Sequence, residues 1–230
     1  METIGAVLTL FLTLDPALTG IVGLSLRVSL AAVAIAALIG APLGAAMAIW
    51  KFPGRRGVLL VFSTLMGLPP VVVGLCIYLL LSRAGPLGEL GLLFTPTAMI
   101  FAQSVLVLPI VLTLTHQAVR PLAAEYDDLL TSVDASPSLR LSTVLWDARF
   151  AVATALMAGF GRAIAEVGAV LIVGGNINGH TRVMTTAIAM ETSKGALELA
   201  LGLGVVLLAV ALSVNLVSLV FTSFGRRYEA

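Results

Sequence analysis

The sequence predicts an all-α membrane protein with five membrane-crossing helices, or six if a short N-terminal segment also crosses. Hydrophobic residues make up 59% of the chain, charged residues make up 11%, and the mean hydropathy is +1.09. Soluble domains contain roughly 45–50% apolar residues. Here the apolar residues form runs close to the ~20 residues that cross a hydrocarbon core. The net charge of +1 argues against nucleic acid as a partner, since that would require a basic surface.

The first apolar segment, residues 4–14, is short and ends before Asp15 and Pro16. Residues 1–17 are therefore expected to lie along the interface or to form a partial span. They lack the charged start and the A-x-A pattern of a cleaved signal peptide. The longer apolar runs, which we expect to cross the bilayer, cover residues 18–50, 57–81, 96–115, 150–173 and 197–221.

Basic residues predict the orientation, because Lys and Arg are retained on the cytoplasmic side. With five spans, one side carries Lys51, Arg55, Arg56, Arg120, Arg140, Arg149, Arg226 and Arg227. The opposite side carries Arg83, Arg182 and Lys194. The bias predicts a membrane domain over residues 18–222, a cytoplasmic loop over about residues 118–149, and a cytoplasmic tail over residues 223–230.

The cytoplasmic loop contains the polar stretch EYDDLLTSVDASPSLR, residues 125–140, which interrupts an otherwise apolar chain. It predicts two short helices. Helical spacing in the first places an apolar stripe at Leu122, Tyr126, Leu129, Leu130 and Val133. In the second, Ser136 is the expected N-cap and Pro137 the first helical residue. The apolar side of the first helix is expected to pack on lipid headgroups, on the ends of the chain's own spans, or on another protein. Its acids weaken the lipid alternative, because interfacial helices favour Lys and Arg, and we favour docking on another protein.

This loop resembles that of ABC importer membrane subunits, in which two short helices dock on the ATPase. The family pattern is E-A-A, three residues, Gly, then nine residues to I-x-L-P. Asp128-Leu129-Leu130 falls at E-A-A, Asp134 at the glycine and Val144 at the isoleucine, while Trp146-Asp147 replaces the final Leu-Pro. The resemblance implies an ATPase-coupling role for Glu125, Asp128, Leu129, Leu130, Asp134, Ala135 and Ser136.

Other stretches are similar, in order, to tungstate-type oxyanion permeases, and more distantly to molybdate and sulfate permeases. Among them are STLMGLPPVVVGL, GPLGELGLLFTPTAMIFAQ and AEVGAVLIVGGNINGHTRVMTTAIAMETSKG. The resemblance runs from about residue 15 to 215. It implies a type I importer permease fold in a prokaryotic inner membrane and a homodimer. It also implies an ATPase subunit pair that binds ATP and Mg, and an extracytoplasmic oxyanion-binding protein. Tungstate is the first substrate expected.

The chain is not expected to be an enzyme or to bind a cofactor. It contains no G-x-x-x-x-G-K-[ST] phosphate-binding loop, so any ATP must bind another chain. His116, His180 and Cys76 do not form a recognisable metal site. The residues alone leave open an ATP-independent anion channel or secondary transporter, although Glu166 is the one carboxylate well inside a predicted span and no repeat is evident.

Two sets of residues within the spans are candidates for the translocation pathway or its gate. Arg162 and Glu166 lie four apart on one helix face; we favour a structural or gating ion pair over direct substrate contact. Pro69 and Pro70 remove backbone donors in mid-span, which predicts either a simple kink or a broken helix lining the pathway.

A polar segment at residues 174–195 is too short to cross and predicts a re-entrant or interfacial helix at the pathway mouth. An oxyanion needs hydrogen-bond donors, which makes Asn176, Thr181, Arg182 and Thr185 the candidates. An ordinary solvated loop is the alternative for each of them.

Overall fold

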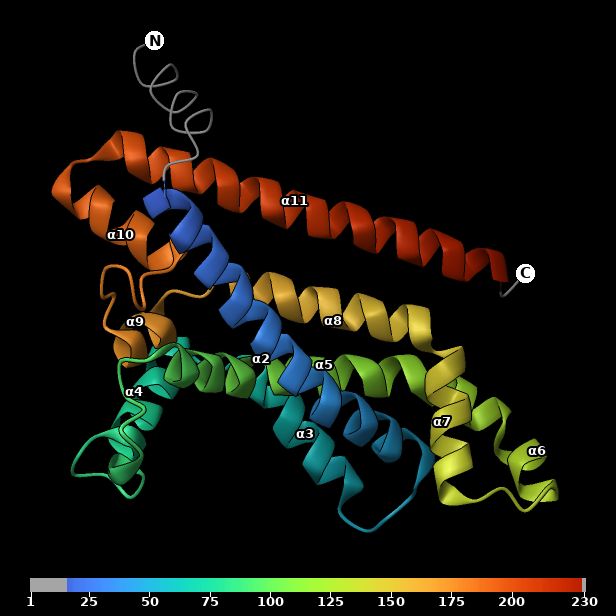
Figure 1. Ribbon diagram of the computed structural model, residues 1–230. Helices are drawn as coiled ribbons and strands as arrows, with labels where there is room; N and C mark the ends of the chain where they lie inside the picture. Colours follow the sequence, from blue (N-terminus) through green and yellow to red (C-terminus); the bar gives the residue numbers. More distant parts are fainter. Residues whose placement is uncertain (1–15, 229–230) are drawn as a thin grey trace. The chain divides into compact units, whose positions relative to one another are not determined.

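The computed structural model describes residues 16–228, so the expectation for residues 4–14 lies outside the described part of the chain (Figure 1). Within it, all regular structure is helical, as predicted. The elements are α2 (Pro16–Ile49), α3 (Arg55–Leu65), α4 (Pro70–Leu81), the 3₁₀ turn η1 (Gly88–Leu90), α5 (Pro96–Glu125), α6 (Asp127–Ser132), α7 (Pro137–Asp147), α8 (Arg149–Ile164), α9 (Gly168–Gly174), α10 (Met184–Lys194) and α11 (Leu197–Tyr228).

Among residues 16–228, three helices are each long and apolar enough to cross a membrane: α2, α5 and α11. Two bent helix pairs, α3 with α4 and α7 with α8, bring the total to five if each pair counts as one span. The α7–α8 pair bends by 74°. The sequence instead assigned α7 to the cytoplasmic loop and continued the span beyond α8.

The predicted span over residues 150–173 contains a break that the sequence did not indicate, since α8 ends at Ile164 and α9 begins at Gly168. Glu166 stabilises this break. Its Oε1 accepts the backbone N–H of Ala169 at 3.0 Å, which satisfies one of the unpaired donors in the first turn of α9. Its backbone carbonyl accepts the hydroxyl of Thr185 at 2.7 Å.

The predicted end of the fourth span, near residue 115, is also corrected. Helix α5 continues to Glu125 with Pro109 and Pro121 inside it. The predicted first loop helix is therefore divided: Leu122 belongs to α5, while Leu129 and Leu130 belong to the short α6. Tyr126 lies between the two helices and is the N-cap of α6.

The chain forms two compact units, of which the first contains the described residues up to Ala32, Pro69–Gln103 and Arg162–Ser213. Close packing of α4 on α9 builds its core. A Cβ on Gly74 would lie 2.7 Å from Cα of Ala169, so only glycine permits this approach. The side chains of Val73, Ile77, Val170 and Val173 are buried in this unit.

The second unit contains Val33–Leu68, Ser104–Gly161 and the described residues from Val214 onward. Helices α2 and α5 approach closely at Gly44. A Cβ atom at this position would clash with the carbonyl oxygen of Leu112, so glycine permits the approach. At the loop end of this unit, a buried cluster joins α2, α5, α6 and α7; it consists of Ala45, Ala48, Val119, Leu130, Val144 and Ala148. This cluster fixes α6 and α7 against the end of α5 (Figure 1).

Candidate functional site

Arg140 organises the turn that connects α6 to α7. Its Nη2 donates to the hydroxyl of Thr131 at 3.0 Å, and its Nε donates to the carbonyl of Ala135 at 3.2 Å. Its Nη1 lies 3.5 Å from Oδ1 of Asp127. One guanidinium therefore holds both ends of α6 and the connecting turn, so the loop has a defined shape. Sequence reasoning missed this role, because Arg140 lies nine residues from Thr131 and thirteen from Asp127 and shows no local pattern.

The turn also depends on Asp134, whose φ of 48° places it in the left-handed region. Non-glycine residues seldom adopt this conformation, and Asp is one of the few that do. Asp134 falls at the glycine of the ABC importer loop pattern, so the structure gives a physical reason for glycine there. After the turn, Ser136 caps α7 as predicted: its hydroxyl accepts the N–H of Leu139 at 3.3 Å.

The predicted apolar stripe divides into a buried and an exposed part. Leu130 is buried in the cluster, and Leu122 and Tyr126 pack against it. Leu129 and Val133 point outward, with 61% and 63% of their surface exposed. Leu139 and Trp146 of α7 are also exposed, at 51% and 69%. We call Leu129, Val133, Leu139 and Trp146 the exposed loop surface.

The far end of α7 is held by two aromatic contacts and a hydrogen bond. The guanidinium of Arg149 lies 5.1 Å from the ring centre of Trp146 and 4.7 Å from that of Phe150. The hydroxyl of Tyr126 is hydrogen-bonded to Asp147, and this bond together with the charge of Asp147 raises the pKa of Tyr126. Asp147 therefore ties the end of α7 to the residue preceding α6.

In the first unit, Arg162 and Glu166 form the ion pair that their spacing allows. Glu166 is almost fully buried, at 3% exposed, whereas a third of the Arg162 side chain is exposed. Because Glu166 also accepts from Ala169, its carboxylate has partners at both oxygens. Gln103, which the sequence analysis did not single out, contacts the end of α8: its Nε2 donates to the carbonyl of Ala163 at 3.0 Å.

The polar segment before α10 is a packed structure around two buried threonines. The Thr181 hydroxyl donates to the carbonyl of Gly174 at 2.6 Å and accepts the N–H of Ile177 at 2.9 Å. Thr185 is buried and bonds to Glu166 as described above. Both hydroxyls are therefore committed to the backbone.

The other two candidates of this segment retain side-chain atoms with no partner in the described chain. These are Nε of Arg182 and Oδ1 of Asn176. Asn176 has a left-handed φ of 51°, and its Nδ2 lies 3.3 Å from Sδ of Met190. Arg182 as a residue is half-buried, and its Nε is a buried donor without a partner in the described chain, next to the N-terminus of α10.

Pro69 and Pro70 begin α4 instead of kinking a continuous helix. Pro69 is the N-cap, Pro70 occupies the first turn, and residues 66–69 separate α4 from α3. Proline suits the start of a helix, where its missing N–H would have no helical partner. A pathway role for this helix start stays a prediction.

The chain is similar to known proteins over most of its length. A family model described as the binding-protein-dependent transport system inner membrane component matches residues 40–229. A probable anion ABC transporter permease protein of Haloferax volcanii is 45% identical over 203 residues, which cover 86% of this chain and 88% of the relative. The tungstate uptake system permease protein TupB of Peptoclostridium acidaminophilum is 41% identical over 216 residues, covering 94% and 95%. The TupB protein of Campylobacter jejuni is 39% identical over 169 residues, covering 74% and 71%.

Family membership decides against the ATP-independent channel or secondary transporter that the residues alone left open. Proteins of this family contain no nucleotide-binding domain and no cofactor of their own, and a partner ATPase hydrolyses the ATP. The chain belongs to the family of binding-protein-dependent transport system inner membrane components, and it is the permease of an ABC importer in the inner membrane.

Proposed function

We propose that this permease imports an oxyanion, tungstate in the first instance, as a homodimer with a pair of ATPase subunits and an extracytoplasmic binding protein. The observation that carries the substrate is the likeness to TupB of P. acidaminophilum, which covers 94% of this chain at 41% identity. Tungstate and molybdate are close in size and charge, so the binding protein shares in the selection between them.

The exposed loop surface is the proposed docking site for the ATPase. Exposed apolar side chains on a polar loop mark a surface for a protein partner. Glu125, Asp128 and Ser136, which the family resemblance assigns to coupling, are exposed or half-exposed near it. Leu130 supports the surface from below, while Asp134 and Ala135 shape the turn, where Ala135 accepts from Arg140. The positive-inside bias of the sequence supports a cytoplasmic position for this loop.

Within the first unit, we assign different roles to the pathway candidates. Arg182 is the proposed oxyanion donor, because its Nε is uncommitted, and Asn176 lies in the same segment. Thr181 and Thr185 position this segment through bonds to the backbone. Arg162 and Glu166 hold the break between α8 and α9 in a gating role, and Pro69 with Pro70 aims the start of α4.

The experiment uses the tagged permease, purified in mild detergent with the ATPase that accompanies it. ATP hydrolysis is measured with and without tungstate and the soluble extracytoplasmic fraction. Stimulation that requires both additions supports an ATP-driven tungstate importer. If molybdate or sulfate stimulated hydrolysis and tungstate did not, the stimulating oxyanion would be the substrate and the tungstate assignment would be wrong.

The donor assignment is tested by Arg182→Gln, with Arg83→Gln as the control for an exposed arginine on the same predicted side of the membrane. We expect Arg182→Gln to reduce tungstate uptake by about tenfold, since a charge-assisted hydrogen bond is lost, while basal ATP hydrolysis stays unchanged. Equal uptake by the two variants would remove Arg182 from the pathway.

A further inference from the structure

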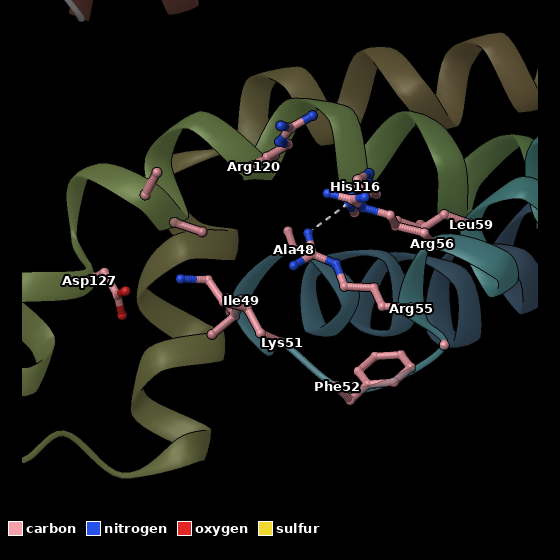
Figure 2. Close-up of a pocket in the computed structure, with 13 residues that line it drawn as sticks. Ala48, Ile49, Lys51, Phe52, Arg55, Arg56, Leu59, His116, Arg120 and Asp127 are labelled. Carbon is pink, nitrogen blue, oxygen red and sulfur yellow. Dashed lines mark hydrogen bonds between the residues drawn. The ribbon is translucent and has the colours of Figure 1, made fainter.

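A cavity of about 740 Å³ lies within the second unit, between the end of α2, the start of α3 and the end of α5 (Figure 2). This volume is in the range of small-molecule sites, roughly 300–1,000 Å³. Its lining residues include Lys51, Arg55, Arg56, His116, Arg120 and Asp127. None of its lining residues belongs to the exposed loop surface or to the pathway candidates, so neither proposed role uses it.

The charges that line this cavity do not balance. Four basic side chains, from Lys51, Arg55, Arg56 and Arg120, line the cavity together with one acid, Asp127. That acid already lies 3.5 Å from Arg140. None of the four cations forms an ion pair with an acid among the described residues. Clustered cations repel one another, so the site is complementary to an anion.

Arg55 and His116 add a built polar contact at the inner wall. Arg55 Nη2 lies 3.4 Å from Nε2 of the buried His116 (Figure 2). An arginine can only donate, so His116 accepts here as a neutral imidazole and contributes no balancing charge. Arg55 also begins α3, whose N-cap, Gly54, provides no side-chain cap. The positive end of this helix therefore adds to the field of the cations.

Apolar residues complete the walls. Ile49, Phe52 and Leu59 line the cavity beside the cations, and Phe52 is exposed. Further along α3, Leu60 and Val61 are exposed, which suits contact with acyl chains if α3 lies in the bilayer. A charged group bound at the cations would thus have an apolar surface beside it.

We propose that this cavity binds a phosphate-type oxyanion group at Arg55, Arg56, Arg120 and Lys51. Planar guanidinium groups match phosphate and related oxyanions with paired hydrogen bonds. Two sources share this chemistry: the headgroup of an anionic phospholipid, which basic pockets between membrane helices recruit, and a free oxyanion in the cytoplasm. Binding here does not depend on which substrate the importer carries.

The test compares the wild-type complex with an Arg56→Gln/Arg120→Gln variant, which removes two exposed cations from the cavity. An Arg27→Gln/Arg83→Gln variant, which removes two exposed cations outside it, is the matched control. In one arm, the complexes are reconstituted in phosphatidylcholine nanodiscs containing phosphatidylglycerol, and retained phosphatidylglycerol is counted by native mass spectrometry. In the other arm, pure phosphatidylcholine nanodiscs are dialysed against labelled phosphate or tungstate.

We expect the cavity variant to retain about tenfold less anion than the wild type or the control in at least one arm. A loss confined to phosphatidylglycerol identifies the lipid headgroup, and a loss confined to phosphate or tungstate identifies a free oxyanion. The cavity variant would still retain tungstate that is bound in the transport pathway. Failure of this cavity proposal can therefore be told apart from failure of the proposed substrate. Equal retention by all three proteins in both arms would overturn the proposal.

Discussion

Single residues decide whether the loop between α6 and α7 keeps its shape, and Asp134 shows this most directly. Its φ of 48° is unfavourable for most side chains, tolerable for Asp, and free of strain for glycine. The backbone conformation of Asp134 therefore lowers the stability of the loop, and the hydrogen bonds that Arg140 makes nearby offset this loss.

Asp134→Gly should leave the unfolding midpoint unchanged or raise it slightly, whereas Asp134→Val should lower the stability by about 1–2 kcal/mol, because a β-branched residue is strained in the left-handed region. The midpoint is measured by thermal unfolding in detergent. Ser142→Val, at an exposed helical position in α7, is the control. If Asp134→Val and the Ser142→Val control had the same unfolding midpoint, the inference that the turn is strained at position 134 would be wrong.

Tyr126 gives a prediction about alkaline pH. Asp147 raises the pKa of Tyr126 above its ordinary value, about 10. With a raised pKa in the folded state, the contribution of this group to stability is complete below pH 10. It is lost as the pH rises through the folded-state pKa. From pH 7 to 9 the group should therefore produce no change in stability.

Tyr126→Phe removes the hydrogen bond to Asp147 and should lower the unfolding midpoint at neutral pH. It should also reduce the decline in stability above pH 10. Phenolate absorbance, compared between wild type and variant, isolates this residue among the three tyrosines of the chain. A phenolate that titrates at or below the ordinary pKa would contradict the bond to Asp147.

At the scale of helices, the sequence predicted those elements that a local pattern determines. The long apolar runs of α2 and α11 came out with nearly the right start and end, because hydropathy alone specifies them. Ser136-Pro137 located the start of α7 through local capping chemistry. The exposed part of the apolar stripe could not be separated from the buried part, since that depends on the distant Val119 and Val144.

The interruption after α8 was missed for a similar reason. The stretch Ala165-Glu166-Val167 contains neither proline nor glycine and looks helical. What stabilises the break is the bond from Thr185, nineteen residues away, together with the Glu166 carboxylate at the first turn of α9. A long-range contact of this kind leaves no periodic signal in the sequence.

The same element gives a prediction about stability. Glu166→Gln keeps an oxygen that can accept from Ala169 but leaves Arg162 without its partner, so we expect a loss of about 1–2 kcal/mol. This is below the 3–5 kcal/mol typical of breaking a fully buried pair, because Arg162 is partly exposed. Glu166→Ala should lose roughly 1–2 kcal/mol more, because the helix donor is also orphaned.

The double variant Arg162→Gln/Glu166→Gln checks that the loss comes from the pair. Its destabilisation, measured by thermal unfolding in detergent, should be smaller than the sum of the two single variants, because the interaction is removed only once. Simple additivity of the single variants would mean that the two side chains contribute independently.

At the scale of the whole molecule, the chain combines long apolar helices with a polar loop. Its long helices are too apolar for water, with the candidate span in α11 only 6% buried by the protein itself. The loop from α6 to α7 is polar, is held in shape by Arg140, and leaves several apolar side chains exposed. An importer permease needs both, because substrate crosses among the membrane helices while ATP hydrolysis takes place on another protein.

The proposed role of the loop in coupling yields the last prediction, Leu129→Arg. Leu129 is exposed, so the substitution should leave the fold intact, but a charge on the exposed loop surface should prevent the ATPase from docking. We expect tungstate uptake in reconstituted vesicles to fall by about tenfold or more, with less ATPase recovered with the tagged permease. Leu90→Arg places the same charge on another exposed leucine, at η1, and should transport normally. If Leu129→Arg retained the uptake and the ATPase recovery of the control, α6 would not carry the coupling, and α7 with Trp146 would be the remaining contact.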